Sequence, residues 1–167
     1  DRPSMVWQSD ITYIPIGGRH YYAVFIIDVY TKKIVGHKVS DNMRSLANMD
    51  ALNRALNENA APMYHHSDRG SQYTYKGYID LLKKNGSRIS MALSAQDNAY
   101  AERINRTIKE EYLDHWRPKD FGQLKRMTAK AVKNYNSKRL HNNNNRMSPE
   151  KFIGQFPLLR PQQRKLM

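Results

Sequence analysis

The first forty residues alternate between apolar and polar side chains in a pattern that predicts three strands. Residues 6–15, VWQSDITYIP, are rich in the β-branched and aromatic types that favour strands. A turn at Gly17 and Gly18 leads into the apolar run HYYAVFIIDVY, and a second turn at residues 31–33 leads into IVGHKVS. The pattern predicts an antiparallel meander whose middle strand is apolar enough to be buried on both faces.

Helical spacing begins at Ser45. Four apolar residues lie three or four positions apart there, namely Leu46, Met49, Leu52 and Leu56, which predicts an amphipathic helix. A short strand at residues 63–66 then precedes a second helix that ends at Asn85 and Gly86. Residues 88–91 are expected to form a fifth strand.

The second half of the chain predicts two long basic helices. The first has Asp97 as its expected cap, and its apolar stripe comprises Ala101, Ile104, Ile108 and Tyr112. Asp120 and Gln123 have the spacing of a capping box for the second helix, and Ser148 with Pro149 predicts the start of a terminal helix. This order of elements predicts an α/β domain, a five-stranded mixed sheet with helices on both faces.

The charge of the chain narrows its function. Twenty-eight Lys and Arg residues against 15 Asp and Glu residues give the 167-residue chain a formal net charge of +13, which favours a polyanionic partner. The absence of Cys excludes a disulfide framework, a thiolate zinc site and a cysteine nucleophile. The longest apolar stretch, residues 21–29, is about half of a membrane span, so we expect no membrane association and a cytoplasmic location.

Three acidic residues are candidates for chemistry in this basic chain. Asp10 lies within an apolar strand, where an unpaired carboxylate is costly. Asp68 follows the strand at 63–66, and a crossover through the preceding helix would place that strand beside the first. Glu102 lies early in a helix, away from its apolar stripe. Converging carboxylates need a cation, and Mg²⁺ and Mn²⁺ prefer such oxygen ligands.

The metal interpretation competes with structural ones. By composition alone the 15 acidic residues offer many triplets, and Asp10 could instead pair with a nearby Lys or Arg. Asp68 could serve only as a turn former ahead of Arg69. Glu102 could be solvated, with Asp97 as the third ligand, although the backbone amides of a helix start would occupy the oxygens of Asp97.

His65, His66 and Asp28 could be mistaken for metal ligands, and none of them is expected to be one. His65 and His66 are adjacent on a strand and point to opposite faces, so they cannot both face one ion. At most His66 borders the site. Asp28 is interpreted as structural, with Lys32 and Lys33 of the next turn as its ion partners.

Basic residues near the third acid are the candidate DNA contacts. Arg106 and Lys109 share the helix face of Glu102, one and two turns further on, and we expect both to bind the nucleic-acid backbone. Lys133 and Arg139 are further candidates, although lysines spaced along any amphipathic helix give the same pattern.

Several segments together resemble the catalytic core of insertion-sequence transposases of the retroviral-integrase type. They are, in order, WQSDITYI, IDVYTKKIVG, HHSDRGSQY, ISM, DNAYAERINRTIKEEYL and YNSKRLHNNNNRMSPEKF, and they span nearly the whole chain. The resemblance implies a ribonuclease H-like fold. It also implies a catalytic, metal-binding triad of Asp10, Asp68 and Glu102, with Mg²⁺ or Mn²⁺ bound as a pair of ions.

The chain departs from the family pattern at two places. The family has about 35 residues between its second and third acids, whereas 33 residues separate Asp68 from Glu102 here, with the shortfall between Met91 and Asp97. Leu140 also stands where the family normally has Pro, which affects the expected turn rather than the chemistry.

The resemblance implies a DNA transposase core that cleaves a phosphodiester with water and joins the freed 3′-hydroxyl to another DNA strand. The alternatives are an inactive or domesticated DNA-binding module and a ribonuclease H-like nuclease. We expect a core spanning residues 1–167, with residues 1–5 as a linker and residues 157–167 as a basic tail. The family's N-terminal DNA-binding domain is absent from this chain, which reads as part of a longer protein. The expected partners are DNA and further copies of the chain assembled on it, while the DNA end sequence and target preference stay open.

Overall fold

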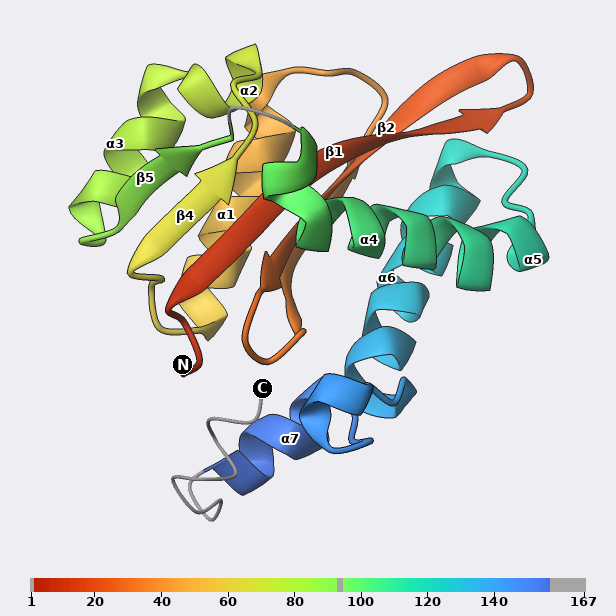
Figure 1. Cartoon of the computed structure of the whole chain (residues 1–167). Coiled ribbons are helices and arrows are strands. Elements are labelled where there is room, and N and C mark those ends of the chain that lie inside the picture. Colours follow the sequence, from red (N-terminus) through yellow and green to blue (C-terminus); the bar gives the residue numbers. More distant parts are fainter. Residues whose placement is uncertain (1, 93–94, 157–167) are drawn as a thin grey trace.

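A five-stranded mixed sheet forms the centre of the protein, and the computed structural model describes residues 2–92 and 95–156 (Figure 1). The strands are β1 (Val6–Ile16), β2 (Arg19–Asp28), β3 (Ile34–Ser40), β4 (Tyr64–Ser67) and β5 (Arg88–Met91). Their order across the sheet is β3-β2-β1-β4-β5. The first three pair antiparallel, whereas β4 runs parallel to β1 and β5 runs parallel to β4. The predicted meander and the predicted pairing of β4 with β1 are both confirmed.

Helices cover both faces of this sheet (Figure 1). One face carries α1 (Ser45–Glu58), α2 (Ser71–Thr74) and α3 (Lys76–Lys84), and the other carries α4 (Ala99–Ile108) and α6 (Phe121–Lys138). The remaining elements are η1 (Ala95–Asn98), the π-helical turn η2 (Lys109–Leu113), α5 (Asp114–Trp116), η3 (Asn142–Asn144) and α7 (Pro149–Gln155). Within the described residues, no helix combines the length and the apolar character that crossing a bilayer requires.

A two-residue turn sets the register of the β1–β2 hairpin. Gly17 and Gly18 have φ angles of 57° and 76°, a left-handed conformation that glycine adopts without steric cost and that hairpin turns of this length require. The turn joins Ile16 to its partner Arg19, and the resulting register puts Asp10 opposite Phe25 in the middle of the sheet. A shift of one residue would turn Asp10 to the other face.

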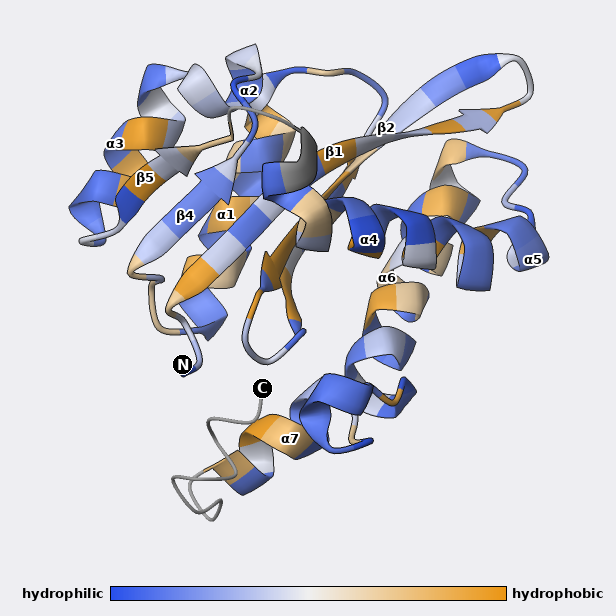
Figure 2. Ribbon diagram, viewed as in Figure 1, coloured by the Kyte–Doolittle hydropathy of each residue, from blue (hydrophilic) through white to orange (hydrophobic). Residues whose placement is uncertain are grey.

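The strand β2 is buried on both of its faces, as its unbroken apolar run predicts. Phe25 and Ile27 belong to the core under α4 and α6, whereas Val24 and Ile26 belong to the core under α1 and α3. Figure 2 shows hydrophilic colouring on the hairpin end of β2 and on much of the ribbon of α4, whereas the half of β2 far from the hairpin is hydrophobic. The sheet therefore has one apolar core on each side.

Two of the three predicted helix caps are confirmed. The Asp120 side chain accepts a hydrogen bond of 2.7 Å from the backbone N–H of Gln123 at the start of α6, and Ser148 caps α7 in the same way. The predicted cap at Asp97 is wrong. Asp97 lies in the 3₁₀ turn η1, ahead of α4. The Gln8 side chain, rather than Asp97, accepts hydrogen bonds from the first amides of α4.

The packing face of α1 agrees only in part with the predicted one. Leu52 is buried, and Met49 and Leu56 pack partly buried against the core. Leu46, however, is 65% exposed, and Asn48, Ala51 and Ala55 are buried as well. The reason is the close approach of α1 to β3. A Cβ atom on Gly36 would lie 2.4 Å from the Ala51 carbonyl oxygen, so small side chains rather than leucines must face the sheet at this point.

The apolar stripe of α4 is also displaced beyond its predicted third turn. Ala101, Ile104 and Ile108 are buried as expected, but the next fully buried side chain is Leu113 rather than Tyr112. The π-helical turn η2 inserts one extra residue per turn at this point. The apolar stripe therefore continues five residues after Ile108 instead of four.

Asp28 has the structural role expected of it, but with different partners. Its side chain is buried and accepts hydrogen bonds from three backbone N–H groups, those of Ser4, Tyr30 and Thr31, at 2.6, 3.0 and 2.8 Å. These amides, rather than the predicted ion pairs with Lys32 and Lys33, satisfy the carboxylate, because the β2–β3 turn wraps its own backbone around the strand end.

A side chain of β1 anchors the start of α4. The Gln8 amide oxygen accepts hydrogen bonds from the backbone N–H groups of Tyr100 and Ala101, at 3.1 and 3.4 Å, and the Gln8 amide nitrogen donates to the Asp97 carbonyl at 3.2 Å. Gln8 is 8% exposed. The first amides of α4, which have no partner within their own helix, are thus satisfied from a neighbouring strand.

Two further hydrogen bonds continue this contact along the next two residues of β1. The Asn98 side chain donates to the Ser9 carbonyl at 3.0 Å, and the Asn105 side chain donates to Oδ2 of Asp10 at 2.8 Å. We call the three links from Gln8, Ser9 and Asp10 to this helix the β1–α4 clamp. The clamp fixes both the position of α4 along β1 and its rotation about its own axis.

Substituting Gln8→Met tests the clamp. The variant keeps an unbranched side chain of similar size but leaves buried amides unpaired, so we expect a loss of about 1–2 kcal/mol in the free energy of unfolding. We also expect faster hydrogen exchange at the amides of Tyr100 and Ala101, measured by NMR. The matched control is Gln123→Met, because Gln123 accepts a hydrogen bond from the Lys119 N–H at the exposed start of α6. Unchanged exchange at the start of α4 would contradict the clamp.

Candidate active site

Asp10 occupies the middle of β1 and faces α4. Side chains alternate along a strand, so Ser9 points to the opposite face, where its hydroxyl hydrogen-bonds the Tyr73 hydroxyl at 2.9 Å. Asp10 is partly buried, and Oδ2 accepts the hydrogen bond from Asn105. The carboxylate is therefore held in one orientation at the surface of the central sheet.

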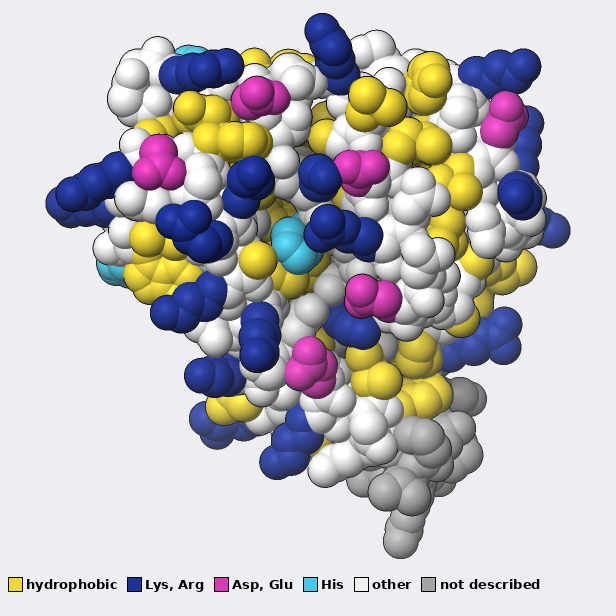
Figure 3. All heavy atoms as spheres, turned by 180° about the vertical axis from the view of Figure 1, so that it is seen from behind, with side chains coloured by type: hydrophobic (Ala, Val, Ile, Leu, Met, Phe, Trp, Pro, Cys, Tyr) yellow, Lys and Arg dark blue, Asp and Glu magenta, His cyan; other side chains and the backbone are white. Residues whose placement is uncertain are grey.

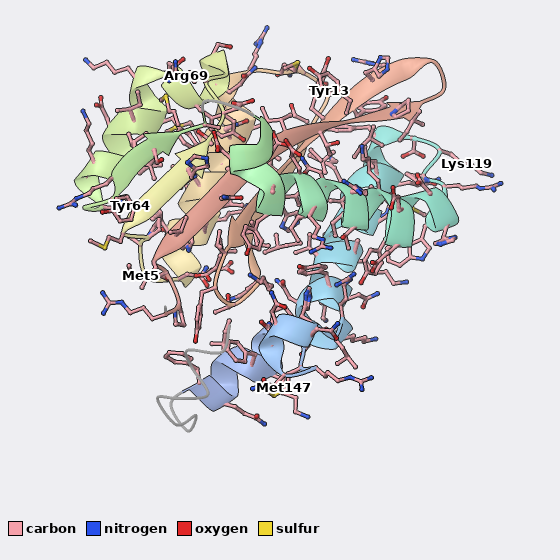
Figure 4. All side chains as sticks on the ribbon, viewed as in Figure 1. Met5, Tyr13, Tyr64, Arg69, Lys119 and Met147 are labelled. Atoms are coloured by element: carbon pink, nitrogen blue, oxygen red, sulfur yellow. The ribbon has the colours of Figure 1, made fainter. Side chains whose placement is uncertain are left out.

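Asp68 is the first residue after β4, the strand that pairs with β1. The side chain is exposed, and its Oδ1 accepts a hydrogen bond of 2.8 Å from the Gly70 N–H. This hydrogen bond confirms that Asp68 stabilises the turn. It uses only Oδ1, so Oδ2 can still accept a hydrogen bond or bind a cation. Figure 4 labels the adjacent Arg69, which lies along the same edge of the molecule as Tyr13 of β1.

Glu102 lies in the first turn of α4, and the clamp brings it over β1. Glu102 and Asp10 line one open groove with a volume of about 270 Å³. The other lining residues are Ile11, Thr12, Tyr13, Asn105, Arg106 and Lys109. The structure therefore brings two of the three predicted acids, and two of the predicted DNA contacts, into a single groove.

The charges of Asp68 and Glu102 both act on Asp10. The pKa of Asp10 is raised to about 6, first because burial penalises the ionised form and then because the charges of Asp68 and Glu102 repel it. The backbone at Ile11 and the Asn105 amide lower the pKa but do not cancel these effects. Both other candidate acids therefore oppose ionisation of Asp10.

The donor set fits a hard divalent cation. All three candidate ligands are carboxylates, which suit Mg²⁺ and Mn²⁺, and mutual repulsion among them is the charge pattern that a bound cation would relieve. Among the described residues, no three His, Asp or Glu side chains form a group that could hold a metal ion. Metal coordination by Asp10, Asp68 and Glu102 therefore stays a prediction.

Sequence reasoning did not identify the two amide side chains that organise this groove. Asn105 holds Asp10, and Gln8 holds the helix that carries Glu102. A weak signal was present, because Gln8 and Asp10 share one face of their strand and Asn105 follows Glu102 by three residues on its helix. Spacing alone did not reveal that the two faces meet.

The four predicted DNA contacts lie at different places. Arg106 and Lys109 line the groove beside the acids, whereas Lys133 is exposed on α6. The guanidinium of Arg139 donates to both carboxylate oxygens of Glu111, at 2.7 and 2.6 Å. Figure 3 shows that Lys and Arg side chains also outnumber acidic ones on the face opposite to that of Figure 1. Positive charge is therefore spread widely, and the groove holds two of the four candidates.

The two adjacent histidines point to opposite faces, as predicted. His65 is buried and its Nε2 hydrogen-bonds the Tyr78 hydroxyl at 2.9 Å, while Nδ1 of His66 hydrogen-bonds the Ser90 hydroxyl at 2.9 Å. Each imidazole therefore has a structural partner. Burial lowers the pKa of His65 to about 3, so this ring stays neutral.

The two departures from the family pattern are local. Arg139 has φ and ψ of −69° and 122°, the extended conformation that a following Pro would favour, so the turn forms with Leu140 in that place. Of the segment between Met91 and Asp97 where the spacing is short, residues 93–94 lie outside the described residues, as does the predicted basic tail at 157–167.

Sequence relatives of the chain are transposases. The transposase of insertion sequence IS629 from Shigella sonnei is 36% identical over 143 residues, which cover 84% of this chain and 48% of that protein. The transposase of IS904 from Lactococcus lactis is 32% identical over 155 residues, which cover 90% of this chain and 61% of that protein. The chain thus spans roughly half to three fifths of the length of these relatives.

The chain is also similar to solved structures of integrase catalytic cores and matches two family profiles. The catalytic core domain of HTLV-2 integrase in complex with magnesium superimposes with a TM-score of 0.75 at 17% identity, covering 90% of this chain and 96% of that one. The catalytic core of BIV integrase gives 0.71 at 18% identity, with 93% and 97% covered. The shared fold is the predicted ribonuclease H-like one. Two integrase core domain profiles match residues 1–95 and 88–149, and the chain therefore belongs to the integrase core domain family.

Proposed function

We propose that this chain is the catalytic core of a DNA transposase. In this proposal it cleaves a phosphodiester at a transposon end with water and then joins the freed 3′-hydroxyl to a second DNA strand. The observation that carries the proposal is the groove in which Asp10 and Glu102 face Arg106 and Lys109, within a chain of the integrase core family. Both reactions are in-line displacements at phosphorus, so one site serves two oxygen nucleophiles.

Asp10, Asp68 and Glu102 are the proposed metal ligands, and we propose that they hold two Mg²⁺ or Mn²⁺ ions. When bound, such ions activate a nucleophilic oxygen and stabilise the leaving oxygen. The support is the oxygen-only donor set and the repulsion that raises the pKa of Asp10. The HTLV-2 catalytic core, which shares the fold, is described in complex with magnesium.

The other groove residues have positioning roles in this proposal. Arg106 and Lys109 supply charge-assisted hydrogen bonds that hold phosphate oxygens of the DNA backbone. Asn105 fixes the orientation of the Asp10 carboxylate, and the β1–α4 clamp sets where Glu102 lies. The chain thus contributes alignment and charge neutralisation, which are the main requirements of phosphoryl transfer, and forms no covalent intermediate with DNA.

The setting of the reaction follows from the same relatives. They are bacterial transposases, so we propose that the protein acts in the bacterial cytoplasm, where the chromosome lies. Two transposon ends must be brought together, and we propose that copies of the chain assemble on them. Among chains of this fold, the HTLV-2 core is described in dimeric and trimeric forms.

The raised pKa of Asp10 predicts a pH-dependent stability of the metal-free protein. Asp10 binds its proton up to about pH 6 when folded, against an ordinary value of 3.8, so between these values the folded state holds a proton that the unfolded state has released. Stability therefore falls as pH rises through this window, and Asp10→Asn removes up to about 3 kcal/mol of that fall. Urea unfolding at pH 4 and pH 8 measures the difference.

A control and a metal titration complete this experiment. Asp114→Asn removes the same charge at an exposed position of α5, and we expect its pH profile to follow that of the parent chain. Adding Mg²⁺ at pH 8 raises the melting temperature of the parent chain because ligands stabilise the state that binds them, and it leaves that of Asp10→Asn nearly unchanged. Equal effects of Mg²⁺ on both proteins would contradict metal binding at Asp10.

The catalytic proposal is tested on duplexes that carry a transposon end. We expect Mg²⁺-dependent cleavage and strand joining, and Glu102→Gln lowers both rates by about 10²–10³-fold while the protein stays folded and bound to DNA. Glu110→Gln is the control, because Glu110 is exposed on the same helical rod outside the groove, and we expect its rates to stay within about twofold of the parent.

Three outcomes would point elsewhere. DNA binding without cleavage or joining would leave only a DNA-binding module. Hydrolysis of RNA paired to DNA, without strand joining, would identify a nuclease of the same fold. Full activity in the Glu102→Gln variant would remove that residue from the site.

A further inference from the structure

A second cavity lies on the side of α4 that faces away from the carboxylates. It has a volume of about 310 Å³ and is bounded by the β2–β3 turn, α4, the end of α6 and the segment around η3. The contributions of α4 are Tyr100, Arg103 and Thr107 with the buried Ile104, whereas the groove of the acids receives residues 102, 105, 106 and 109. The two hollows therefore use different faces of the same helix.

The polar wall of this cavity is basic. Lys32, Arg103, Arg139 and His141 line it, and none of its lining residues is Asp or Glu. Arg139 is already paired with Glu111. By contrast, the guanidinium of Arg103 has no hydrogen bond or ion pair within the described part of the chain, and Arg103 is exposed to solvent. An exposed cation without a partner among the described residues thus lines a cavity whose lining contains no acid.

Mutual repulsion accompanies this gathering of basic groups. Burial and the charge of Arg103 lower the pKa of Lys32 to about 8, although Asp28 opposes the shift. Burial and the charges of Arg139, Lys32 and Arg103 lower the pKa of His141 to about 4, against an opposing effect of Glu111. An anion in the cavity would relieve both shifts.

An unpaired hydrogen-bonding group also borders the cavity. Nδ1 of His141 lies 3.5 Å from a guanidinium nitrogen of Arg139. Arginine can only donate, so Nδ1 is the acceptor and the proton of the neutral ring is on Nε2. Among the described residues, Nε2 is buried without any hydrogen-bond partner. Its residue lines the cavity, so the basic wall includes a buried donor without a partner.

The remaining lining combines apolar side chains with the polar residues Thr107, Asn142 and Asn143, and part of it is open to solvent. Lys32 lies over the Tyr100 ring, with Nζ 4.1 Å from the ring centroid, and the Tyr100 side chain is 37% exposed. Leu140 is 60% exposed at the same cavity. The volume is at the small end of the range for small-molecule sites. Cations on one wall and exposed aromatic and aliphatic surface on another match a ligand with a charged part and a flat apolar part.

We propose that this cavity binds a nucleotide, with its phosphate held by Arg103 and Lys32 and its base against Tyr100 and Leu140. Stacking of bases on aromatic side chains beside basic residues is the usual way in which proteins hold unpaired nucleotides. The ligand is either a free nucleotide or one nucleotide of a DNA strand, which share this chemistry. The proposal does not depend on the metal site, because a different face of α4 forms the cavity.

The test is an NMR titration of the ¹⁵N-labelled chain without metal, with dAMP, deoxyadenosine, inorganic phosphate and a short oligo(dA) as separate ligands. We expect dAMP to shift the amides of Tyr100, Arg103, Ile104 and Thr107 and of residues 139–143, and to bind at least about fivefold more tightly than phosphate or deoxyadenosine. If oligo(dA) shifts the same amides and binds more tightly than dAMP, the source is a DNA strand. If only dAMP binds, the source is a free nucleotide.

A pair of variants locates the site. Arg103→Gln weakens dAMP binding by about tenfold, because it removes a charge-assisted contact to the phosphate. Arg126→Gln, which removes the same charge from an exposed position of α6 outside both hollows, leaves dAMP affinity within about twofold. The proposal is overturned if dAMP shifts only groove residues such as Glu102, if both variants weaken binding equally, or if phosphate binds as well as dAMP. Because the titration measures no reaction, its failure leaves the strand-joining test unaffected.

Discussion

The contact between β1 and α4 is the constraint on which the candidate site depends. Glu102 is more than ninety residues from Asp10 in sequence, and the β1–α4 clamp, together with the buried apolar stripe of α4, brings the two into one groove. The amide side chains that form the three links are neutral. Neutral donors can orient a carboxylate without cancelling its charge, which an Arg or Lys in the same place would do. The groove therefore keeps its negative charge for a cation while its geometry is fixed.

The chain as a whole is positively charged, whereas the groove contains the carboxylates of Asp10 and Glu102. The net charge of +13 attracts polyanions from a distance, whereas in the groove burial and the charges of Asp68 and Glu102 raise the pKa of Asp10. Arg106 and Lys109 stand beside the acids rather than between them. This separation allows phosphate oxygens and divalent cations to meet at one place without the basic side chains occupying the carboxylates.

Much of the fold followed from the sequence because its strongest signals are local. The glycine turn, the apolar run of β2 and the caps at Asp120 and Ser148 each depend on neighbouring residues. The failures have nonlocal causes. The face of α1 is set by Gly36 on another strand, and Gln8 takes the place at the start of α4 that Asp97 was expected to fill. The nearness of the acids followed from the predicted crossover, whereas their identity as a triad came from resemblance.

The π-helical turn η2 changes the direction in which side chains point along the continuous helix formed by α4, η2 and α5. Before it, Glu102 and Arg106 line the groove, and within it Glu111 pairs with Arg139 while Leu113 enters the core. A uniform α-helix would advance by about 100° at each residue, so one extra residue re-phases everything downstream without moving the axis. This continuous helix can thus be rigidly seated at its far end by core packing while its near end keeps the orientation that the carboxylates require.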